Sequence, residues 1–270
     1  MKRVLVISFL STVPILTAGD TPPDPWTILN QGLQSGEVDH RRQTIVALST
    51  LGAGNEEAVG RIEQTLQKDQ SPRVRQQAAL ALGEMKATKS IPALKTALED
   101  TGEVAFAAAK ALMDMGDVSG QAMFVEVLVG ERKDTPSFMT NARRTAEQKL
   151  RHPQGLLLMG AADAAGTMFA PSGMGIVAAQ DAIALRGKGA PGRMAAAAYM
   201  AKDPDPYAVT LLEWALGDDN HLVRVEAAKG LGERGNAGSI AKLQPLLKDD
   251  HTSVRTMAAA SIIRLSAHSR

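Results

Sequence analysis

A short stretch occurs three times in nearly the same form, and this repetition limits the possible folds more than any other feature. The stretches SPRVRQQAALALG, HLVRVEAAKGLG and TSVRTMAAASII align a valine, an arginine, two alanines and an aliphatic residue. The arginines of the last two copies are 31 residues apart, and 31 residues further back lies Arg193 in GRMAAAAYM. A fixed period of this length is typical of repeat architectures, in which each unit stacks on its neighbours.

Each copy predicts two helices with different apolar spacing. The first places apolar residues at i, i+4, i+5 and i+8, as in Val74, Ala78, Ala79 and Leu82. The second follows the spacing i, i+3 and i+7, in Val59, Ile62 and Leu66; Ile91, Leu94 and Leu98; Val209, Leu212 and Leu216; and Ile240, Leu243 and Leu247. One such pair has too little apolar surface to close a core alone. The sequence therefore predicts an all-α protein, an α-α superhelix (an α-solenoid) of stacked helix pairs.

An aspartate precedes the repeated arginine by six residues in three copies, at Asp69, Asp218 and Asp249. Such an aspartate can cap the next helix and lies within reach of the guanidinium on that helix. Repeated pairs predict a ladder along one edge of the stack. The ladder either fixes the angle between repeats or contributes to a protein contact, so the candidate contact residues are Arg75, Arg193, Arg224 and Arg255.

These units resemble HEAT repeats of the short class found in phycobilisome lyase-type proteins. The resemblance rests on the D…VRxxAAxaL core and covers about residues 40–130 and 191–268. It implies a superhelix that holds another protein on its ridge or concave side. The same family includes subunits of enzymes that attach or isomerise bilins, which provides an alternative function.

The repeat rhythm predicts N-terminal repeats over 20–130 and C-terminal repeats over 191–270. In the copy at 103–116, Ala105 replaces the arginine and interrupts the ladder. Residues 131–190 lose the period, are rich in glycine and methionine, and predict an irregular helical segment. This segment is either an unpaired helix, a bend, a plug against the groove, a buried seam between the arrays, or two degenerate repeats.

The N-terminus has the layout of a secretory signal peptide over residues 1–19. A basic MKR precedes the apolar run VLVISFLSTVPIL, and small residues follow in TAGD. The run is too short for a stable membrane span. We therefore expect an exported protein, periplasmic or extracellular. The chain has no cysteine, so disulfides and thiol chemistry are excluded.

Composition and motifs favour binding over catalysis. Lys and Arg number 30 against 29 Asp and Glu, and this balance does not predict a nucleic-acid partner. No phosphate loop or nucleophile elbow is present. The turns DDNH (218–221) and DDH (249–251) could bring histidines and carboxylates together at a metal, but aspartate at these turns already has a capping role. We therefore predict no catalytic residue, cofactor or metal.

Three aromatic residues, Tyr199, Tyr207 and Trp214, fall within one repeat. Tyrosine and tryptophan commonly anchor protein interfaces. Tyr207 and Trp214 are therefore candidate protein-contact residues, although Trp214 could instead pack against the next repeat. The sequence as a whole predicts an exported, non-catalytic scaffold for another protein. The alternative is a bilin-lyase-like or other small-ligand enzyme subunit with its pocket in the central segment.

Overall fold

The computed structural model describes residues 22–129 and 190–268, which contain twelve α-helices and no strand. The first part comprises α1 (Pro25–Leu33), α2 (Val38–Ser49), α3 (Glu56–Lys68), α4 (Pro72–Glu84), α5 (Ile91–Thr96), α6 (Gly102–Asp114) and α7 (Gln121–Val129). The second comprises α11 (Ala190–Lys202), α12 (Tyr207–Ala215), α13 (His221–Arg234), α14 (Ile240–Leu243) and α15 (Thr252–His268). The predicted signal peptide and nearly all of the central segment lie outside the described residues.

Local sequence signals set the ends of these helices. Asp24 and Asn55 accept backbone N–H bonds at the starts of α1 and α3, both at 2.9 Å. Pro72 begins α4, where a missing N–H costs nothing. Gly235 ends α13 in the left-handed region, with φ of 77°, which glycine adopts without strain. The helix pairs and turns thus follow the pattern that the sequence predicts.

The predicted apolar positions form the core. In α4, Val74, Ala78, Ala79 and Leu82 are fully buried, and the equivalent residues of α13 and α15 are also buried. The second helices of the pairs contribute Ile62, Leu94, Leu212 and Leu243, which are almost completely inaccessible. Both predicted spacings are therefore confirmed, and the chain forms an α-solenoid.

Small residues let the first helices of neighbouring repeats approach closely. A Cβ added to Gly83 in α4 would lie 2.8 Å from the Cα of Ala111 in α6. Gly232 in α13 approaches Ser261 in α15 in the same way, with 3.1 Å from an added Cβ to the Cα of Ser261. Larger side chains at these positions would push the helices apart.

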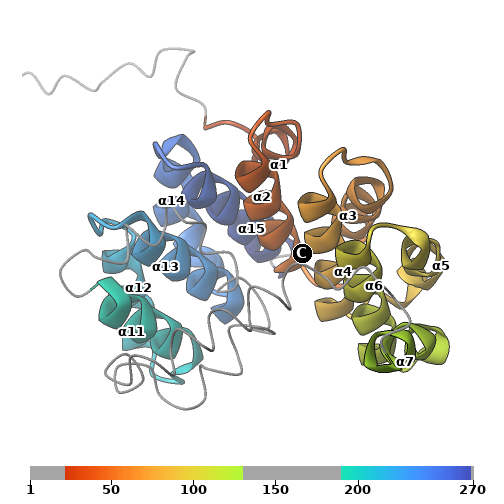
Figure 1. The fold of residues 1–270 in the computed structure, drawn as a ribbon. Coiled ribbons are helices and arrows are strands. Elements are labelled where there is room, and N and C mark those ends of the chain that lie inside the picture. Colours follow the sequence, from red (N-terminus) through yellow and green to blue (C-terminus); the bar gives the residue numbers. More distant parts are fainter. Residues whose placement is uncertain (1–21, 130–189, 269–270) are drawn as a thin grey trace, which may run out of the picture.

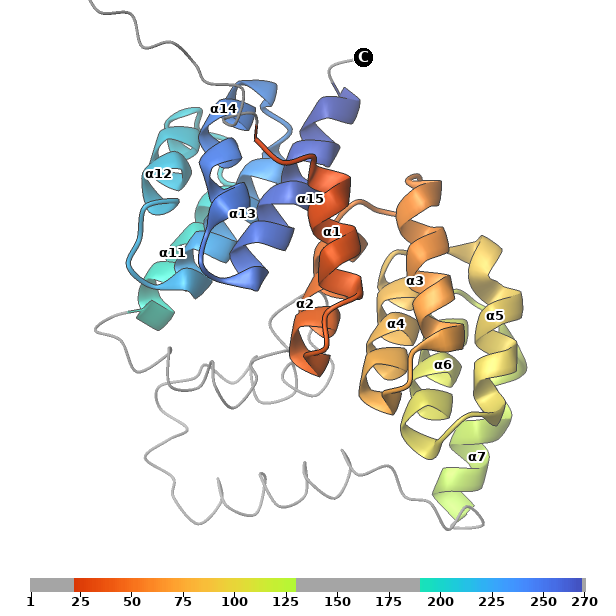
Figure 2. The same ribbon diagram turned by 90° about the horizontal axis from the view of Figure 1, so that it is seen from above.

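The first and last described helices of the chain meet in the middle of the stack. Figures 1 and 2 both place α15 beside α1 and α2. The first helices contact one another in the spatial order α11, α13, α15, α2, α4, α6, and α1 packs against α15 in the position of a second helix. One repeat is therefore built from the last and the first described helices. We call the boundary between α15 and α2, covered by α1, the seam.

Candidate protein-interaction surfaces

The repeated arginines form the predicted ladder, and the guanidinium of Arg224 shows how a rung joins two loops. Arg224 donates from Nε and Nη2 to the carboxylate of Asp249, at 2.8 and 2.9 Å. Its Nη1 donates to the backbone oxygens of Asp218 and Asp219 in the preceding loop. The same two-oxygen carboxylate contact is made by Arg41 with Asp69, Arg75 with Asp100, and Arg193 with Asp218.

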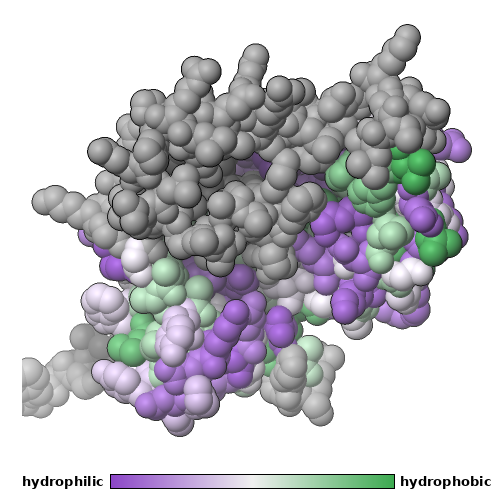
Figure 3. Space-filling view, turned by 60° about the horizontal axis from the view of Figure 1, so that its bottom comes forward, coloured by the Kyte–Doolittle hydropathy of each residue, from purple (hydrophilic) through white to green (hydrophobic). Residues whose placement is uncertain are grey.

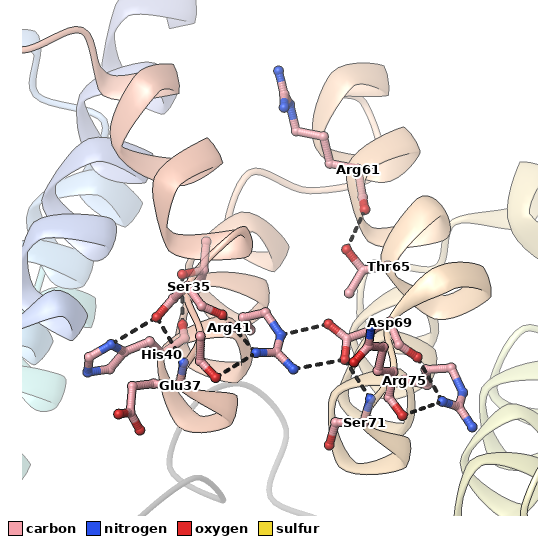
Figure 4. Close-up of polar contacts among 12 residues, drawn as sticks. Ser35, Glu37, His40, Arg41, Arg61, Thr65, Asp69, Ser71 and Arg75 are labelled. Carbon is pink, nitrogen blue, oxygen red and sulfur yellow. Dashed lines mark hydrogen bonds and ion pairs between the residues drawn. The ribbon is translucent and has the colours of Figure 1, made fainter.

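Figure 4 shows this arrangement at Arg41, which lies between the α1–α2 loop and Asp69. Asp69 also accepts a bond from the backbone N–H of Ser71 at 2.8 Å, which orders the turn before α4. Asp218 and Asp249 order the corresponding turns before α13 and α15. Each aspartate therefore stabilises its own turn and holds the previous repeat.

The pairing differs in one respect from the sequence prediction. Arg75 donates to the backbone oxygen of Asp69, six residues before it, and not to the carboxylate of that residue. Its carboxylate partner is Asp100 in the next repeat. The prediction of a pair within one repeat was wrong because the aspartate side chain faces the preceding repeat while ordering its own turn.

The pKa values of three ladder carboxyls, Asp100, Asp218 and Asp249, are lowered. The hydrogen bond from Arg193 lowers the pKa of the Asp218 carboxyl, and the bond from Arg75 does the same for Asp100. For Asp249 burial acts in the opposite direction, but bonds from Arg224 and from the His251 backbone still leave the pKa lowered. The carboxylates of these three aspartates are thus held in their charged form.

The predicted contact arginines now divide into two groups. Arg75, Arg193 and Arg224 each hold an aspartate with Nε and Nη2, so their contact with another protein stays a prediction and would use only their remaining surface. Arg255 has the same Nη1 bonds to its own loop, but none of the carboxylates in the described residues pairs with it. At Ala105 the ladder lacks its arginine, as the sequence indicates.

The histidine-containing turns come together without forming a ligand cluster. The rings of His221 and His251 stack with centroids 4.1 Å apart and planes 17° apart. Within residues 22–129 and 190–268, no group of three or more His, Asp and Glu side chains could hold a metal ion. Burial, followed by the charge of His221, lowers the pKa of His251.

An aromatic and apolar stripe lies exposed on α12. Tyr207 is 63% exposed, Leu211 37% and Trp214 77%, while Ala208 and Leu212 face the core. The spacing i, i+4 and i+7 puts the three exposed residues on one face of the helix. Trp214 therefore does not pack against the next repeat. Leu211 was missed by the sequence analysis, although its position between two aromatic residues at helical spacing could have revealed it.

Large exposed apolar residues occur only in the two outermost repeats of the described structure. Those near α12 are joined by Tyr199 on α11, and those at the other end are Met113, Val118 and Val125. Figure 3 shows strongly hydrophobic residues near the end formed by α5–α7, next to a largely hydrophilic surface. Of the two groups, only the one on α11 and α12 contains aromatic residues, which makes α12 the better candidate for a protein contact.

Comparisons with known proteins agree with the repeat architecture. The family model for HEAT repeats matches residues 27–113, 64–137 and 182–264. A search of curated proteins finds no match. None of the helices in the described residues is long and apolar enough to cross a membrane.

Several solved structures are similar to the chain, including the following two. One is human deoxyhypusine hydroxylase in complex with glycerol, at 20% identity, with 90% of this chain and 97% of that chain covered and a TM-score of 0.35. The other is the complex of CpcE and CpcF of phycocyanin lyase from a Nostoc species, at 20% identity, with 94% and 99% covered and a TM-score of 0.34. At these TM-scores the two structures establish no shared function.

Proposed function

Because the chain belongs to the HEAT-repeat family, we propose that it is an exported scaffold without catalytic activity that binds another protein through the exposed face of α12. The observation that carries this proposal is Trp214, which is 77% exposed in a protein with only two tryptophans. The other, Trp26, is partly buried and lies under the guanidinium of Arg61, at 5.1 Å from its ring centroid.

The shape of the stripe favours a helix of the partner as its occupant. Tyr207, Leu211 and Trp214 extend about 10 Å along α12, from the rise of roughly 1.5 Å per residue. A row at this spacing packs along the apolar face of a second helix. Tyrosine and tryptophan contribute large contact areas and also carry a polar group that stays hydrogen-bonded at the rim.

The test combines capture from the native exported fraction with fluorescence of the purified complex. The bait is residues 20–270, beside the variants Trp214→Ala and Tyr199→Ala, the second being a matched exposed aromatic on α11. Loss of an anchor of this kind costs about 2 kcal/mol, roughly a thirtyfold weakening. We expect Trp214→Ala to lose the partner at this level, while Tyr199→Ala retains it and both variants keep the circular dichroism spectrum of the parent.

Fluorescence then locates the contact. In a Trp26→Phe background Trp214 is the only tryptophan, and burial by the purified partner should shift its emission to shorter wavelength. A partner that binds with no change in this emission, and equally well to Trp214→Ala, would refute the α12 face as the binding surface.

The proposal that the protein is exported is based on the predicted signal peptide over residues 1–19, and it is tested separately. The first described helix begins at Pro25, so cleavage after Ala18 or Gly19 would leave α1 whole. N-terminal sequencing of protein recovered outside the cytoplasm should begin at Gly19 or Asp20. Recovery of the chain only in the cytoplasm with Met1 retained would contradict export and leave the binding proposal to its own test.

A further inference from the structure

Five ladder arginines follow one another along the stack, and four of them hold a carboxylate. In spatial order, Arg193 holds Asp218, Arg224 holds Asp249, Arg41 holds Asp69 and Arg75 holds Asp100. Arg255 lies between Arg224 and Arg41 and pairs with none of the carboxylates of residues 22–129 and 190–268. Among these five arginines, the one without a carboxylate lies at the seam, where α15 meets α1 and α2.

Ser35 occupies the position at which the missing aspartate would lie. Arg41 donates from Nη1 to the backbone oxygens of Ser35 and Gly36, just as Arg75 donates to those of Asp69 and Gln70. The hydroxyl of Ser35 accepts the backbone N–H of Glu37 at 3.2 Å, the turn contact that the aspartates make elsewhere with their carboxylates. Ser35 therefore preserves the turn but offers no pair of oxygens to the preceding arginine.

Arg255 keeps the ladder geometry on its other side. Its Nη1 donates to the backbone oxygens of Asp249 and Asp250, at 2.6 and 3.0 Å, and its Nη2 donates to the hydroxyl of Thr252 at 2.8 Å. Nη2 carries a second N–H, and Nε has no acceptor in the described structure. The guanidinium is thus held in place with Nε open and Nη2 shared with the Thr252 hydroxyl, and the side chain is only partly buried.

We propose that Arg255, beside Ser35 at the seam, is a binding slot for the carboxylate of an aspartate or glutamate side chain on a bound protein. The four neighbouring arginines define the ligand, because each uses the same Nε and Nη2 edge to hold both oxygens of one carboxylate. A planar group with two acceptor oxygens can accept from Nε and Nη2 together. A single hydroxyl cannot take the place of such a group. The identity of the ligand as a protein side chain rests on the proposed scaffold function; the slot itself does not.

The experiment observes the arginine Nε–H groups by nuclear magnetic resonance in the full chain. The resonance of Arg255 is assigned from its loss in Arg255→Lys, which keeps the charge without the fork. Acetate and N-acetyl-aspartate N-methylamide are titrated separately against chloride at constant ionic strength. We expect both carboxylates to shift the Arg255 resonance saturably, with the aspartyl compound binding at least several-fold more tightly, and the resonances of Arg41, Arg75, Arg193 and Arg224 to stay fixed.

Substitution of Ser35 provides the matched control. Ser35→Asp should fill the slot, move the Arg255 resonance toward those of the paired arginines, raise the Tm and abolish the response to added carboxylate. Ser35→Asn keeps the turn without the charge, as Asn236 does in its own turn, and should still respond. The Ser35 hydroxyl also lies 3.3 Å from Nδ1 of His40. Both Ser35 variants lose this contact, so Ser35→Asn also shows what that loss does without an added charge.

Two kinds of result would overturn the proposal, one concerning the slot and one concerning its ligand. If Ser35→Asp leaves the Arg255 resonance unchanged, or if neither carboxylate shifts it, the edge is not a carboxylate slot. If acetate binds as tightly as the aspartyl compound, the ligand is a small free carboxylate and not a protein side chain. Neither kind of result depends on α12. The slot experiment can therefore be interpreted even if the proposed protein contact at α12 is absent.

Discussion

Gly32 is the residue at which the packing of the seam can be tested most directly. It lies in α1, between Thr44 of α2 and Thr256 of α15. A Cβ added to Gly32 would overlap the Thr44 hydroxyl and would lie 3.1 Å from the Thr44 methyl and 3.2 Å from the Thr256 methyl. Gly32→Ala therefore adds one methyl group at the point where helices from both ends of the chain meet.

The expected cost combines three terms. Overpacking of a buried site costs about 1–3 kcal/mol. Rotation of Thr44 to make room breaks the 2.8 Å bond from its hydroxyl to the His40 backbone oxygen, which adds about 1 kcal/mol. Alanine is favoured over glycine in a helix by up to about 1 kcal/mol. We expect Gly32→Ala to lower the free energy of unfolding by about 1–3 kcal/mol, measured by urea unfolding followed by circular dichroism.

A double-mutant cycle separates this contact from general effects. Thr44→Ala removes both atoms that the new methyl group meets first, so the double variant should lose less than the sum of the single losses. Gly60→Ala in α3 is the matched control, because an added Cβ there has no atom within 4 Å. Additivity within about 0.5 kcal/mol, or a Gly32→Ala variant as stable as Gly60→Ala, would refute the packing of α1 between α2 and α15.

Three further predictions concern the ladder, the histidine pair and a close helix contact. The lowered pKa of Asp218 means that the folded state binds a proton less readily than the unfolded chain, so stability is complete above about pH 4 and is lost as pH falls through the lowered pKa. Asp218→Asn should flatten this part of a plot of Tm against pH, and an unchanged slope would contradict the pairing. The lowered pKa of His251 has the same sign, so Tm should fall as pH drops below about 6.5, and His251→Asn should reduce that fall. Gly83→Ala should destabilise at least as much as Gly32→Ala, about 2–3 kcal/mol, because its Cβ meets the backbone of Ala111, which cannot rotate away; a neutral result in urea unfolding would show that α4 and α6 lie further apart.

The helix pairs could be predicted from the sequence because their signals are local. The spacing of Val74, Ala78 and Leu82 fixes one buried face within three turns, and the glycines and prolines mark the ends. The partner of each ladder arginine is not local in this sense. Asp69 lies only 6 residues from Arg75 along the chain and Asp100 lies 25 residues away, and only the stacked structure shows that the carboxylate of Asp100 is the one Arg75 binds.

The seam could not be predicted because it joins residues from opposite ends of the chain. Arg264 in α15 donates to the Thr50 backbone oxygen at the end of α2, at 2.7 Å, across 214 residues of sequence. Nothing in the periodicity of either segment indicates this contact. The exposure of Trp214 was also undecided by spacing, because a residue at the edge of an apolar stripe faces either solvent or a neighbour, depending on the tilt of the next helix pair.

The meeting of the chain ends explains why the ladder is interrupted where it is. Within each array, one continuous stretch of chain supplies both the arginine and the aspartate of a rung, 25 residues apart for Arg224 and Asp249. Across the seam the two positions come from Arg255 and Ser35, and α15 is held there by other contacts: the packing of Gly32 against Thr256 and the bond from Arg264 to Thr50. The seam therefore does not need a carboxylate at position 35 for its integrity. That independence leaves the open edge of Arg255 available to a carboxylate from outside the chain.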